Sequence, residues 1–367
     1  MRSGRNTRLR LGTGVVVGAA ALVAGLVQPA AAAGQQEAVA AGKPTGVKTV
    51  STGWTMPWGT DWLPGGKSAL VTERDSFKVY KATPAGARTV VGTVPYTRTT
   101  DAEGGLMGVA VDPRYKTNKY VYFMHTSTDG TRIARMTYDG TSLTGYKTLV
   151  RGIKKAIVHN GGRLAFGPDE YLYAATGDAT ETSLSQDRKS LNGKILRLTR
   201  DGKPAPGNPF GTLVYSLGHR NPQGLAFDTK GRLWSAELGE SSRDELNLIK
   251  PGRNYGWPIC EGRCAKAGMT DPKKTWKVSV ASPSGIAIVD NAVYMASLRG
   301  ERLWRIPIDP KNESVGAATS HYRGTYGRLR TVTKVPGSDQ LWLSTSNADA
   351  WGGRPAGSDR ILRVTIG

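Results

Sequence analysis

The chain has 367 residues, 38% of them hydrophobic, with 50 Lys and Arg against 29 Asp and Glu and a formal charge of +21. This length can bury one large core or two modest ones, and the hydrophobic share excludes a disordered polymer. Charged residues make up only 22% of the chain, which argues against a nucleic-acid-binding arm. We therefore expect a folded protein with no nucleic-acid partner.

The N-terminal segment has the pattern of an export signal. Four arginines precede an apolar stretch at 15–27, and three alanines follow at 31–33, where a signal peptidase would cut. The stretch is short for a membrane-spanning helix, although an uncleaved anchor is the alternative. We expect residues 1–33 to be a signal peptide, 34–46 a flexible linker, and 47–367 one domain of a secreted or extracytoplasmic protein.

The charge and the cysteines are interpreted in that setting. Removing the first 33 residues takes away four Arg and no acids, which leaves 46 basic against 29 acidic residues, or +17. Such a charge favours association with an anionic cell surface, although no lysine cluster focuses it. Cys260 and Cys264 are the only two cysteines, and in an oxidising compartment they are expected to form a disulfide. A redox pair or half of a zinc site is the alternative, but there is no second pair to complete a zinc shell.

A short strand pattern recurs six times along the chain. Its first residues are separated by 51, 51, 61, 60 and 48 positions. The six units are Leu70-Val71-Thr72-Glu73, Val121-Tyr122-Phe123-Met124, Leu172-Tyr173-Ala174-Ala175, Leu233-Trp234-Ser235-Ala236, Val293-Tyr294-Met295-Ala296 and Leu341-Trp342-Leu343-Ser344. Brief alternating runs that end in turn residues precede several units, and a further strand follows most of them.

Consecutive hairpins with a repeat near fifty residues predict an all-β fold, a six-bladed β-propeller of four-stranded antiparallel blades. Closing the ring buries the apolar face of each blade against its neighbours, so one domain suffices. Residues 47–50 are expected to join the last blade and close the ring. A two-sheet sandwich is the alternative architecture.

Linked motifs in the middle of the chain carry a family resemblance. They are His159-Asn160-Gly161-Gly162-Arg163, Thr176-Gly177-Asp178, Leu191-Asn192-Gly193-Lys194, Gly218-His219-Arg220-Asn221-Pro222-Gln223-Gly224, Glu237-Leu238-Gly239-Glu240 and Asn254-Tyr255-Gly256-Trp257-Pro258. In this order they resemble the soluble aldose sugar (glucose/sorbosone) dehydrogenases that depend on pyrroloquinoline quinone (PQQ). The likeness extends over most of the chain after residue 50, and that family is a six-bladed propeller.

The resemblance implies the catalytic residues. His159 matches the general base that removes the proton of the anomeric hydroxyl while hydride passes to PQQ. Unperturbed imidazole titrates near pH 6.5 and can accept a proton at neutral pH. Asp178 matches the carboxylate that orients this histidine. Taken alone, such a His-Asp pair is more often structural than catalytic.

The resemblance also implies the cofactor contacts. PQQ carries three carboxylates and an ortho-quinone, which require cationic side chains. Arg220 and Asn221 match cofactor contacts, with Gln223 a weaker candidate. Arg328 and Arg330 match a late arginine pair, and a spacing of two on a strand places both on one face.

Two positions depart from the family pattern. Arg299 stands where the family generally has lysine, which changes a point charge into a planar fork. Glu103 stands where the glucose-specific branch has glutamine, and its carboxylate would repel PQQ unless it is protonated or paired.

Calcium is implied by the same resemblance. The family holds the ion against PQQ with backbone carbonyls that here map to Gly239 and Glu240, and a hard cation prefers oxygen donors. Asp244 and Glu245 add negative charge nearby, unless they belong to a solvated loop. Trp276 and Trp351 are expected in loops, where they could contact a sugar.

The resemblance thus implies oxidation of the anomeric carbon of an aldose to a lactone, with PQQ and Ca²⁺. A cofactor-free propeller that binds carbohydrate or cell wall is one alternative, and a calcium-dependent lactonase, whose ion would be held by channel carboxylates, is the other. The motifs do not specify the sugar or the electron acceptor.

Overall fold

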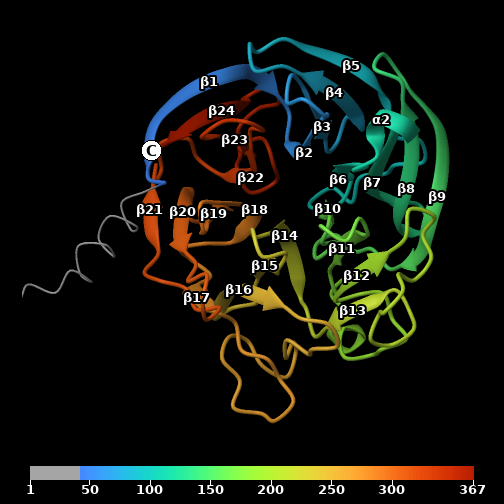
Figure 1. Cartoon of the computed structure of the whole chain (residues 1–367), viewed down its shortest axis with the longest axis vertical. Helices are drawn as coiled ribbons and strands as arrows, with labels where there is room; N and C mark the ends of the chain where they lie inside the picture. The colour runs from blue at the N-terminus through green and yellow to red at the C-terminus, as the bar shows by residue number, and fades with distance from the viewer. Residues whose placement is uncertain (1–41) are drawn as a thin grey trace, which may run out of the picture. The chain divides into compact units, whose positions relative to one another are not determined.

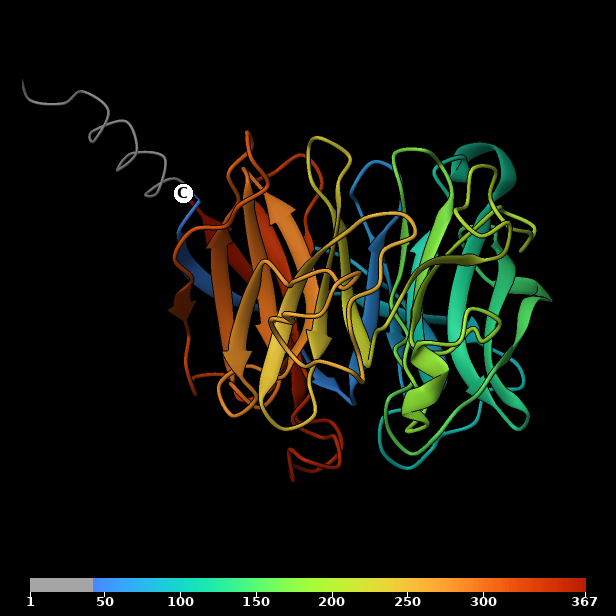
Figure 2. The same ribbon diagram turned by 90° about the horizontal axis from the view of Figure 1, so that it is seen from below.

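The structure is a computed structural model that describes residues 42–367, and these residues form a ring of six blades (Figure 1). Each blade is a four-stranded antiparallel sheet. Seen from the edge, the strands run between the two faces of the ring (Figure 2). The predicted six-bladed propeller is confirmed, and the two-sheet sandwich is excluded.

The first three blades follow one another along the chain. Blade 1 consists of β2 (Pro57–Trp62), β3 (Ala69–Glu73), β4 (Lys78–Ala82) and β5 (Arg88–Thr93). Blade 2 consists of β6 (Leu106–Val111), β7 (Tyr120–Ser127), β8 (Gly130–Tyr138) and β9 (Leu143–Ile153). Blade 3 consists of β10 (Leu164–Phe166), β11 (Leu172–Thr176), β12 (Lys194–Leu198) and β13 (Val214–Leu217).

The remaining blades complete the ring. Blade 4 consists of β14 (Asn221–Phe227), β15 (Leu233–Leu238), β16 (Arg243–Ile249) and β17 (Lys274–Lys277). Blade 5 consists of β18 (Pro283–Val289), β19 (Ala292–Ser297), β20 (Arg302–Pro307) and β21 (Thr319–His321). Blade 6 consists of β22 (Leu329–Lys334), β23 (Gln340–Thr345), β24 (Asp359–Ile366) and β1 (Pro44–Trp54). Within residues 42–367, two short helical turns complete the elements, α2 (Tyr115–Asn118) and the 3-10 turn η1 (Thr182–Ser185).

The two ends of the described chain meet in one sheet. Strand β1 pairs antiparallel with β24, with Val47 opposite Val364 and Thr49 opposite Leu362. The prediction that residues 47–50 join the last blade is confirmed. The strand begins at Pro44, so the last three residues of the expected linker belong to the sheet. The expected signal peptide at 1–33 lies outside the described residues.

The six repeat units of the sequence are the second strands of the six blades. They fall in β3, β7, β11, β15, β19 and β23, and the apolar residues of the six units are buried. The first strands β2, β6, β10, β14, β18 and β22 lie nearest the centre of the ring (Figure 1). Neighbouring blades approach closely there: a Cβ at Gly108 would lie 2.2 Å from the carbonyl oxygen of Gly162, and one at Gly224 would lie 2.4 Å from that of Ser284. Glycine at these positions therefore lets the blades pack.

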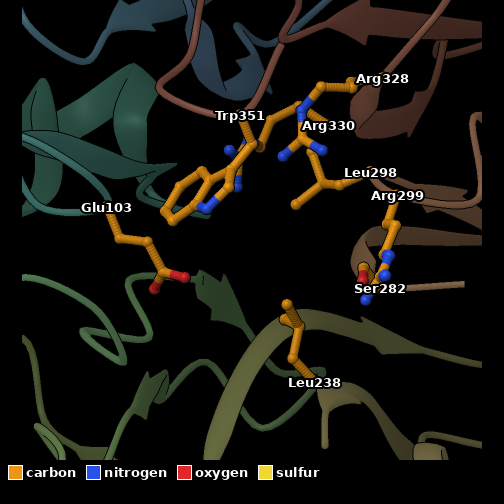
Figure 3. Close-up of a pocket in the computed structure, with 8 residues that line it drawn as sticks. All are labelled: Glu103, Leu238, Ser282, Leu298, Arg299, Arg328, Arg330 and Trp351. Atoms are coloured by element: carbon orange, nitrogen blue, oxygen red, sulfur yellow. The ribbon is translucent and has the colours of Figure 1, made fainter. Parts of the chain in front are cut away.

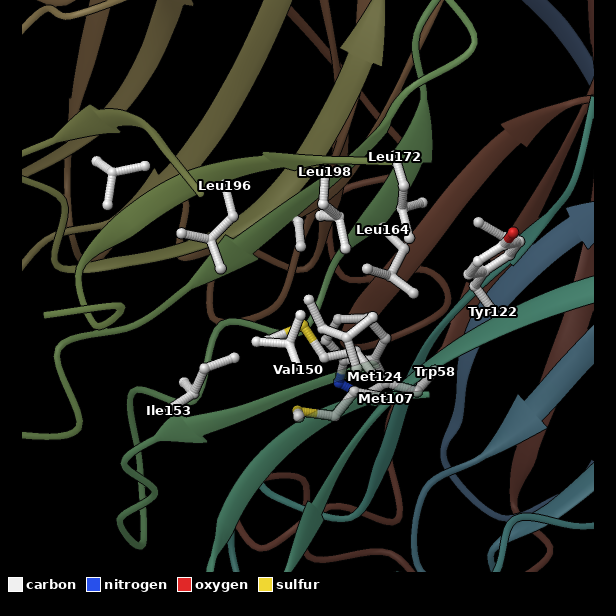
Figure 4. Close-up of a cluster of buried hydrophobic side chains, with 14 residues drawn as sticks. Trp58, Met107, Tyr122, Met124, Val150, Ile153, Leu164, Leu172, Leu196 and Leu198 are labelled. Carbon is white, nitrogen blue, oxygen red and sulfur yellow. The ribbon is translucent and has the colours of Figure 1, made fainter. Parts of the chain in front are cut away.

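Apolar side chains fill the space between blades. Figure 4 shows one such cluster, which lies between blades 2 and 3 and includes Met107, Tyr122, Leu172 and Leu196, all fully buried. Each such side chain contributes about 1.5–3 kcal/mol when removed from water. This packing holds the inner strands rigidly, and their ends carry the side chains of the candidate site.

Outside the blades, the longest excursion joins β16 to β17. Cys260 and Cys264 form a disulfide within it, with 5.6 Å between their Cα atoms, so the disulfide prediction is confirmed. Within residues 42–367, no helix is long and apolar enough to cross a membrane.

Candidate functional site

A cavity of about 460 Å³ opens among the loops of four blades (Figure 3). The residues that line it are Glu103, Leu238, Ser282, Leu298, Arg299, Arg328, Arg330 and Trp351. They come from the segment before β6, the end of β15, the segment before β18, the turn between β19 and β20, the start of β22 with the residue before it, and the segment after β23. Residues more than two hundred positions apart therefore share one cavity because the ring brings the ends of its blades together.

His159 and Asp178 form a hydrogen-bonded pair. The His159 Nδ1 lies 2.8 Å from Asp178 Oδ1, and the aspartate side chain is fully buried. Its other oxygen accepts a hydrogen bond from Trp257 Nε1 at 2.8 Å, and Thr180 N donates to Oδ1. No described residue bonds to His159 Nε2. When Nδ1 carries the proton, Nε2 is therefore a free acceptor.

Backbone geometry fixes this pair in place. His159 has a positive φ of 60° in the connection between β9 and β10. A Cβ at Gly177 would lie 2.0 Å from the His159 carbonyl oxygen, so only glycine lets the two segments meet. The Thr-Gly-Asp motif thus brings Asp178 to the histidine.

Glu103 connects the histidine to the cavity. Its Oε2 accepts hydrogen bonds from His159 N at 2.9 Å, from Asn221 Nδ2 at 3.0 Å and from Gln223 Nε2 at 3.5 Å. The carboxylate that departs from the family pattern is therefore surrounded by donors rather than left unpaired. Three of the predicted site residues, Glu103, Asn221 and Gln223, meet here.

Arg328 and Arg330 share one buried carboxylate. Arg328 Nε and Nη2 each lie 3.0 Å from Asp349 Oδ2, and Arg330 Nη2 lies 3.3 Å from the same oxygen. Arg330 Nη1 also donates to Gln223 Oε1 at 2.9 Å. The two side chains therefore lie on one face, as their spacing predicts.

The electrostatic environment of Arg330 favours an anion. Burial lowers the pKa of Arg330 to about 10; Asp349 opposes this effect, while the neighbouring Arg74 and Arg328 add to it. Deeper in the ring, burial and the charge of Arg330 lower the pKa of Arg163 to about 9. A bound anion would relieve this repulsion between buried cations.

Arg220 is beside the cavity rather than among its lining residues. Its Nε lies 2.9 Å from Glu240 Oε2, and its guanidinium lies 5.4 Å from the centre of the Trp257 ring. It lines a smaller pocket that shares Leu238 with the cavity. The backbone of Asp178 also donates to the Arg220 carbonyl, which ties this segment to the His-Asp pair.

The remaining predicted residues lie on the side of Arg299. Arg299 is exposed in the turn between β19 and β20. Gly239 and Glu240 form the turn after β15, where Gly239 N donates to Asp244 Oδ1 and Glu240 N donates to Glu261 Oε1. The carbonyl oxygens of Gly239 and Glu240 accept no hydrogen bond from a described residue.

The acids near this turn are engaged elsewhere. Burial raises the pKa of Asp244, and burial together with Glu237 raises the pKa of Glu245 to about 8. Both are buried, so neither belongs to a solvated loop. Across residues 42–367, no group of three or more His, Cys, Asp or Glu side chains is arranged to hold a metal ion. Any ion at this turn would depend on carbonyl oxygens.

Trp276 and Trp351, both expected in loops, lie in different surroundings. Trp351 is 51% exposed, follows β23 and lines the cavity, as expected for a loop residue. Trp276 was expected in a loop but lies in β17, where it is buried against Trp304, so that expectation was wrong. Its indole fills the space between blades and does not reach the cavity.

The sequence did not predict Asp349 or the role of Trp257. Asp349 lies in a turn with no motif around it, and its function depends on two arginines about twenty positions earlier. Trp257 belongs to the Asn-Tyr-Gly-Trp-Pro motif, which marks it as distinctive without indicating its partner.

The profile of the Glucose / Sorbosone dehydrogenase family matches residues 54–352. The chain belongs to this family. The resemblance drawn from the motifs is thereby confirmed, and the chain is assigned to a family of oxidoreductases.

Individual relatives agree with the assignment. The chain is similar to an aldose sugar dehydrogenase from Streptomyces coelicolor solved with PQQ bound, with 50% identity, a TM-score of 0.83, and coverage of 89% of this chain and 100% of that one. It is 34% identical to quinoprotein glucose dehydrogenase B of Acinetobacter calcoaceticus, over 59% of this chain and 52% of that protein. It is also 30% identical to an uncharacterized Synechocystis protein, over 81% of this chain and 83% of that one. A gluconolactonase from Xanthomonas campestris, at 14% identity and a TM-score of 0.55, shares the fold alone.

Proposed function

We propose that this family member oxidises the anomeric carbon of an aldose to a lactone, with PQQ as the hydride acceptor. The observation that carries the proposal is the His159-Asp178 pair, in which His159 Nε2 is free. The backbone N–H of His159 donates to Glu103, which lines a cavity rich in arginine. The PQQ-bound relative from Streptomyces coelicolor supports the choice of cofactor.

The cavity suits PQQ in size and chemistry. Its volume of about 460 Å³ lies in the usual range for small-molecule sites, about 300–1,000 Å³. Arg299, Arg328 and Arg330 offer guanidinium groups for carboxylates, and Trp351 offers a flat apolar surface. PQQ bound there would supply a quinone carbon that accepts hydride. We also assign Arg220, Asn221 and Gln223 to the cofactor side of the site.

The protein residues carry the proton chemistry. His159 Nε2 accepts the proton of the anomeric hydroxyl as hydride leaves the anomeric carbon, so the sugar loses two electrons and two protons. Asp178 stabilises the imidazolium that forms, and Trp257 holds the aspartate. Glu103 fixes the backbone of His159, which sets the position of the ring.

Charge balance argues for a cation beside the cofactor. The lining of the cavity includes three arginines and the carboxylate of Glu103, while Asp349 pairs with Arg328 and Arg330. PQQ would bring three carboxylates, and Ca²⁺ beside them would offset part of this negative charge. We propose that the carbonyl oxygens of Gly239 and Glu240 would hold the ion beside the cofactor.

The two alternative functions lack such support. A lactonase of the kind considered requires channel carboxylates grouped around calcium, and residues 42–367 contain no such group. A binding module would not need a histidine oriented by a buried aspartate. We retain secretion, cleavage after residue 33 and association with an anionic cell surface as parts of the proposal.

Reconstitution tests this function. The purified protein is mixed with PQQ and calcium, passed over gel filtration, and assayed with glucose and other aldoses using an artificial electron acceptor. We expect PQQ to be retained and an aldose to be oxidised. Retention without turnover of any aldose would contradict the proposed reaction, and no retention would contradict the proposed cofactor.

A further inference from the structure

A second cavity adjoins the candidate site. It has a volume of about 500 Å³ and shares Arg299 with the first cavity. Its lining residues are Ser241, Ser242, Arg243, Lys277, Val278, Ser279 and Arg299. They come from the β15–β16 turn, the start of β16, the end of β17 and the segment after it, and the β19–β20 turn. We call this cavity the basic groove.

The basic groove concentrates positive charge at a cost to the fold. Arg243 and Lys277 lie directly opposite each other in the β16–β17 pair. Like charges in this position destabilise a sheet. Arg299 adds a third cation from the next blade, and no carboxylate lines the groove. Among the described residues, none of the three side chains forms an ion pair.

The carboxylate of Glu261, beside the groove, binds the backbone of the turn. Glu261 Oε1 accepts hydrogen bonds from the backbone N–H groups of residues 240–243, at 2.7–3.0 Å. This carboxylate therefore fixes the turn that carries Arg243. It orders the wall of the groove and leaves the three cations available to a ligand.

Two other pairs of cationic residues face each other across neighbouring strands, and both differ from the pair in the groove. Arg135 faces Lys147 across β8 and β9, but Arg135 pairs with Asp201 at 2.9 Å. Lys48 faces Arg363 across β1 and β24, and neither residue lines the candidate site or the basic groove. The Arg243-Lys277 pair combines an unneutralised charge with a cavity and a third cation.

We propose that the basic groove binds an anionic group, a phosphate or carboxylate, at the end of the aldose remote from its anomeric carbon. This inference rests on the proposed function. Because Arg299 lines both cavities, a sugar whose anomeric end enters the first cavity can extend its other end into the groove. Guanidinium and ammonium groups, with the hydroxyls of Ser241, Ser242 and Ser279 nearby, are suitable partners for such oxygens.

Steady-state kinetics with matched sugars provide the test. Glucose 6-phosphate is compared with glucose, and glucuronosyl-glucose with cellobiose, in the PQQ-loaded wild type and in the Arg243→Ala/Lys277→Ala variant. We expect at least one anionic sugar to have a KM at least about tenfold below that of its neutral counterpart at low salt. We expect the variant to abolish that advantage while kcat and the KM of the neutral sugar stay within about twofold.

The matched control removes an equivalent charge pair elsewhere. Lys48→Ala/Arg363→Ala lowers the net charge by the same amount but lies outside the lining of both the candidate site and the basic groove, so the anionic advantage should persist. Loss of the advantage in both variants would indicate a general effect of net charge and overturn the proposal. A changed KM for ferricyanide with unchanged sugar kinetics would assign the groove to the electron acceptor instead, which also overturns it.

A binding measurement separates this inference from the proposed reaction. Inorganic phosphate is titrated calorimetrically into the PQQ-free protein at an ionic strength of about 0.01 M, where screening is weak. We expect the Arg243→Ala/Lys277→Ala variant to bind phosphate at least about tenfold more weakly than wild type and the control variant. Equal binding by all three proteins overturns the groove as an anion site, even if no aldose is oxidised.

Discussion

Replacement of Asp178 by Asn tests the role of the buried carboxylate most sharply. Asp178 accepts hydrogen bonds from His159 Nδ1, Thr180 N and Trp257 Nε1. An amide keeps the shape of the side chain but loses its charge, and its NH₂ group must face one of these three donors. The variant therefore weakens both the orientation of His159 and the stabilisation of the imidazolium.

The size of the effect follows from that contact. A hydrogen bond to a charged group contributes about 1.5–3 kcal/mol. Since about 1.36 kcal/mol corresponds to a tenfold change in rate, kcat should fall about 10- to 150-fold. The dissociation constant of PQQ should change little, because the carboxylate does not line the cofactor cavity.

The assay measures kcat with saturating aldose and excess PQQ, and PQQ binding separately by fluorescence quenching. Asp112→Asn is the matched control, because Asp112 is equally buried but pairs with Arg200 instead. We expect the control to lower the melting temperature while leaving kcat of the folded protein unchanged. A folded, PQQ-loaded Asp178→Asn enzyme that retains full kcat would refute the reasoning.

Four further predictions follow from the fold and the site. Arg328→Gln/Arg330→Gln in an Asp349→Asn background, which leaves no buried carboxylate unpaired, should weaken PQQ binding at least about 100-fold by equilibrium titration; an unchanged constant would remove the pair from the cofactor site. Chelation of calcium should release PQQ during gel filtration and calcium should restore its retention, whereas retention in EDTA would count against the ion. Gly108→Ala should lower the melting temperature, because its Cβ would lie 2.2 Å from the Gly162 carbonyl oxygen, and an unchanged value would contradict the close packing. Burial raises the pKa of Asp61 to about 6, so between about pH 4 and 6 the folded state holds a proton that the unfolded state releases. The stability that this proton contributes below about pH 4 is therefore lost as the pH rises to about 6. The free energy of urea unfolding of Asp61→Asn should lack this part of the pH dependence, and pH profiles identical to wild type would contradict the shift.

The sequence predicted the architecture because the repeat has a physical cause. The second strand of each blade is buried between neighbouring blades, so its apolar pattern recurs once in every blade, from Leu70 in β3 to Leu341 in β23. Ring closure was predictable for the same reason, because the strand predicted at residues 47–50 can pair with the edge of the last blade. The predicted start of β1 was three residues too late. Pro44 pairs with Ile366 at the end of the strand, where the sequence pattern is weakest.

The site was predicted less completely because its contacts are made by loops. The motifs identified His159 and Asp178, and the structure brings them into contact. Asp349 could not be predicted, since a single aspartate in a turn acquires its role only when β22 and β23 place it beside two arginines. Arg220 matched a cofactor contact by its motif, and its guanidinium pairs with Glu240 in the pocket that adjoins the cavity.

The two departures from the family pattern have structural consequences of different kinds. Glu103 is accommodated because three donors converge on its Oε2, including the backbone of His159. Arg299 is exposed at the boundary of the cavity and the basic groove, where a planar fork can reach two anions. Neither consequence could be read from the residue types alone.

The central claim is that one cavity holds PQQ while His159 removes the sugar proton, and a single absorbance experiment tests it. PQQ is loaded with calcium into wild type and His159→Ala, excess cofactor is removed, and an aldose is added without an electron acceptor. We expect both proteins to retain PQQ and only the wild type to convert the quinone spectrum to that of the reduced form at once. Equally rapid reduction in the variant, or no cofactor spectrum in the wild type, would contradict the account.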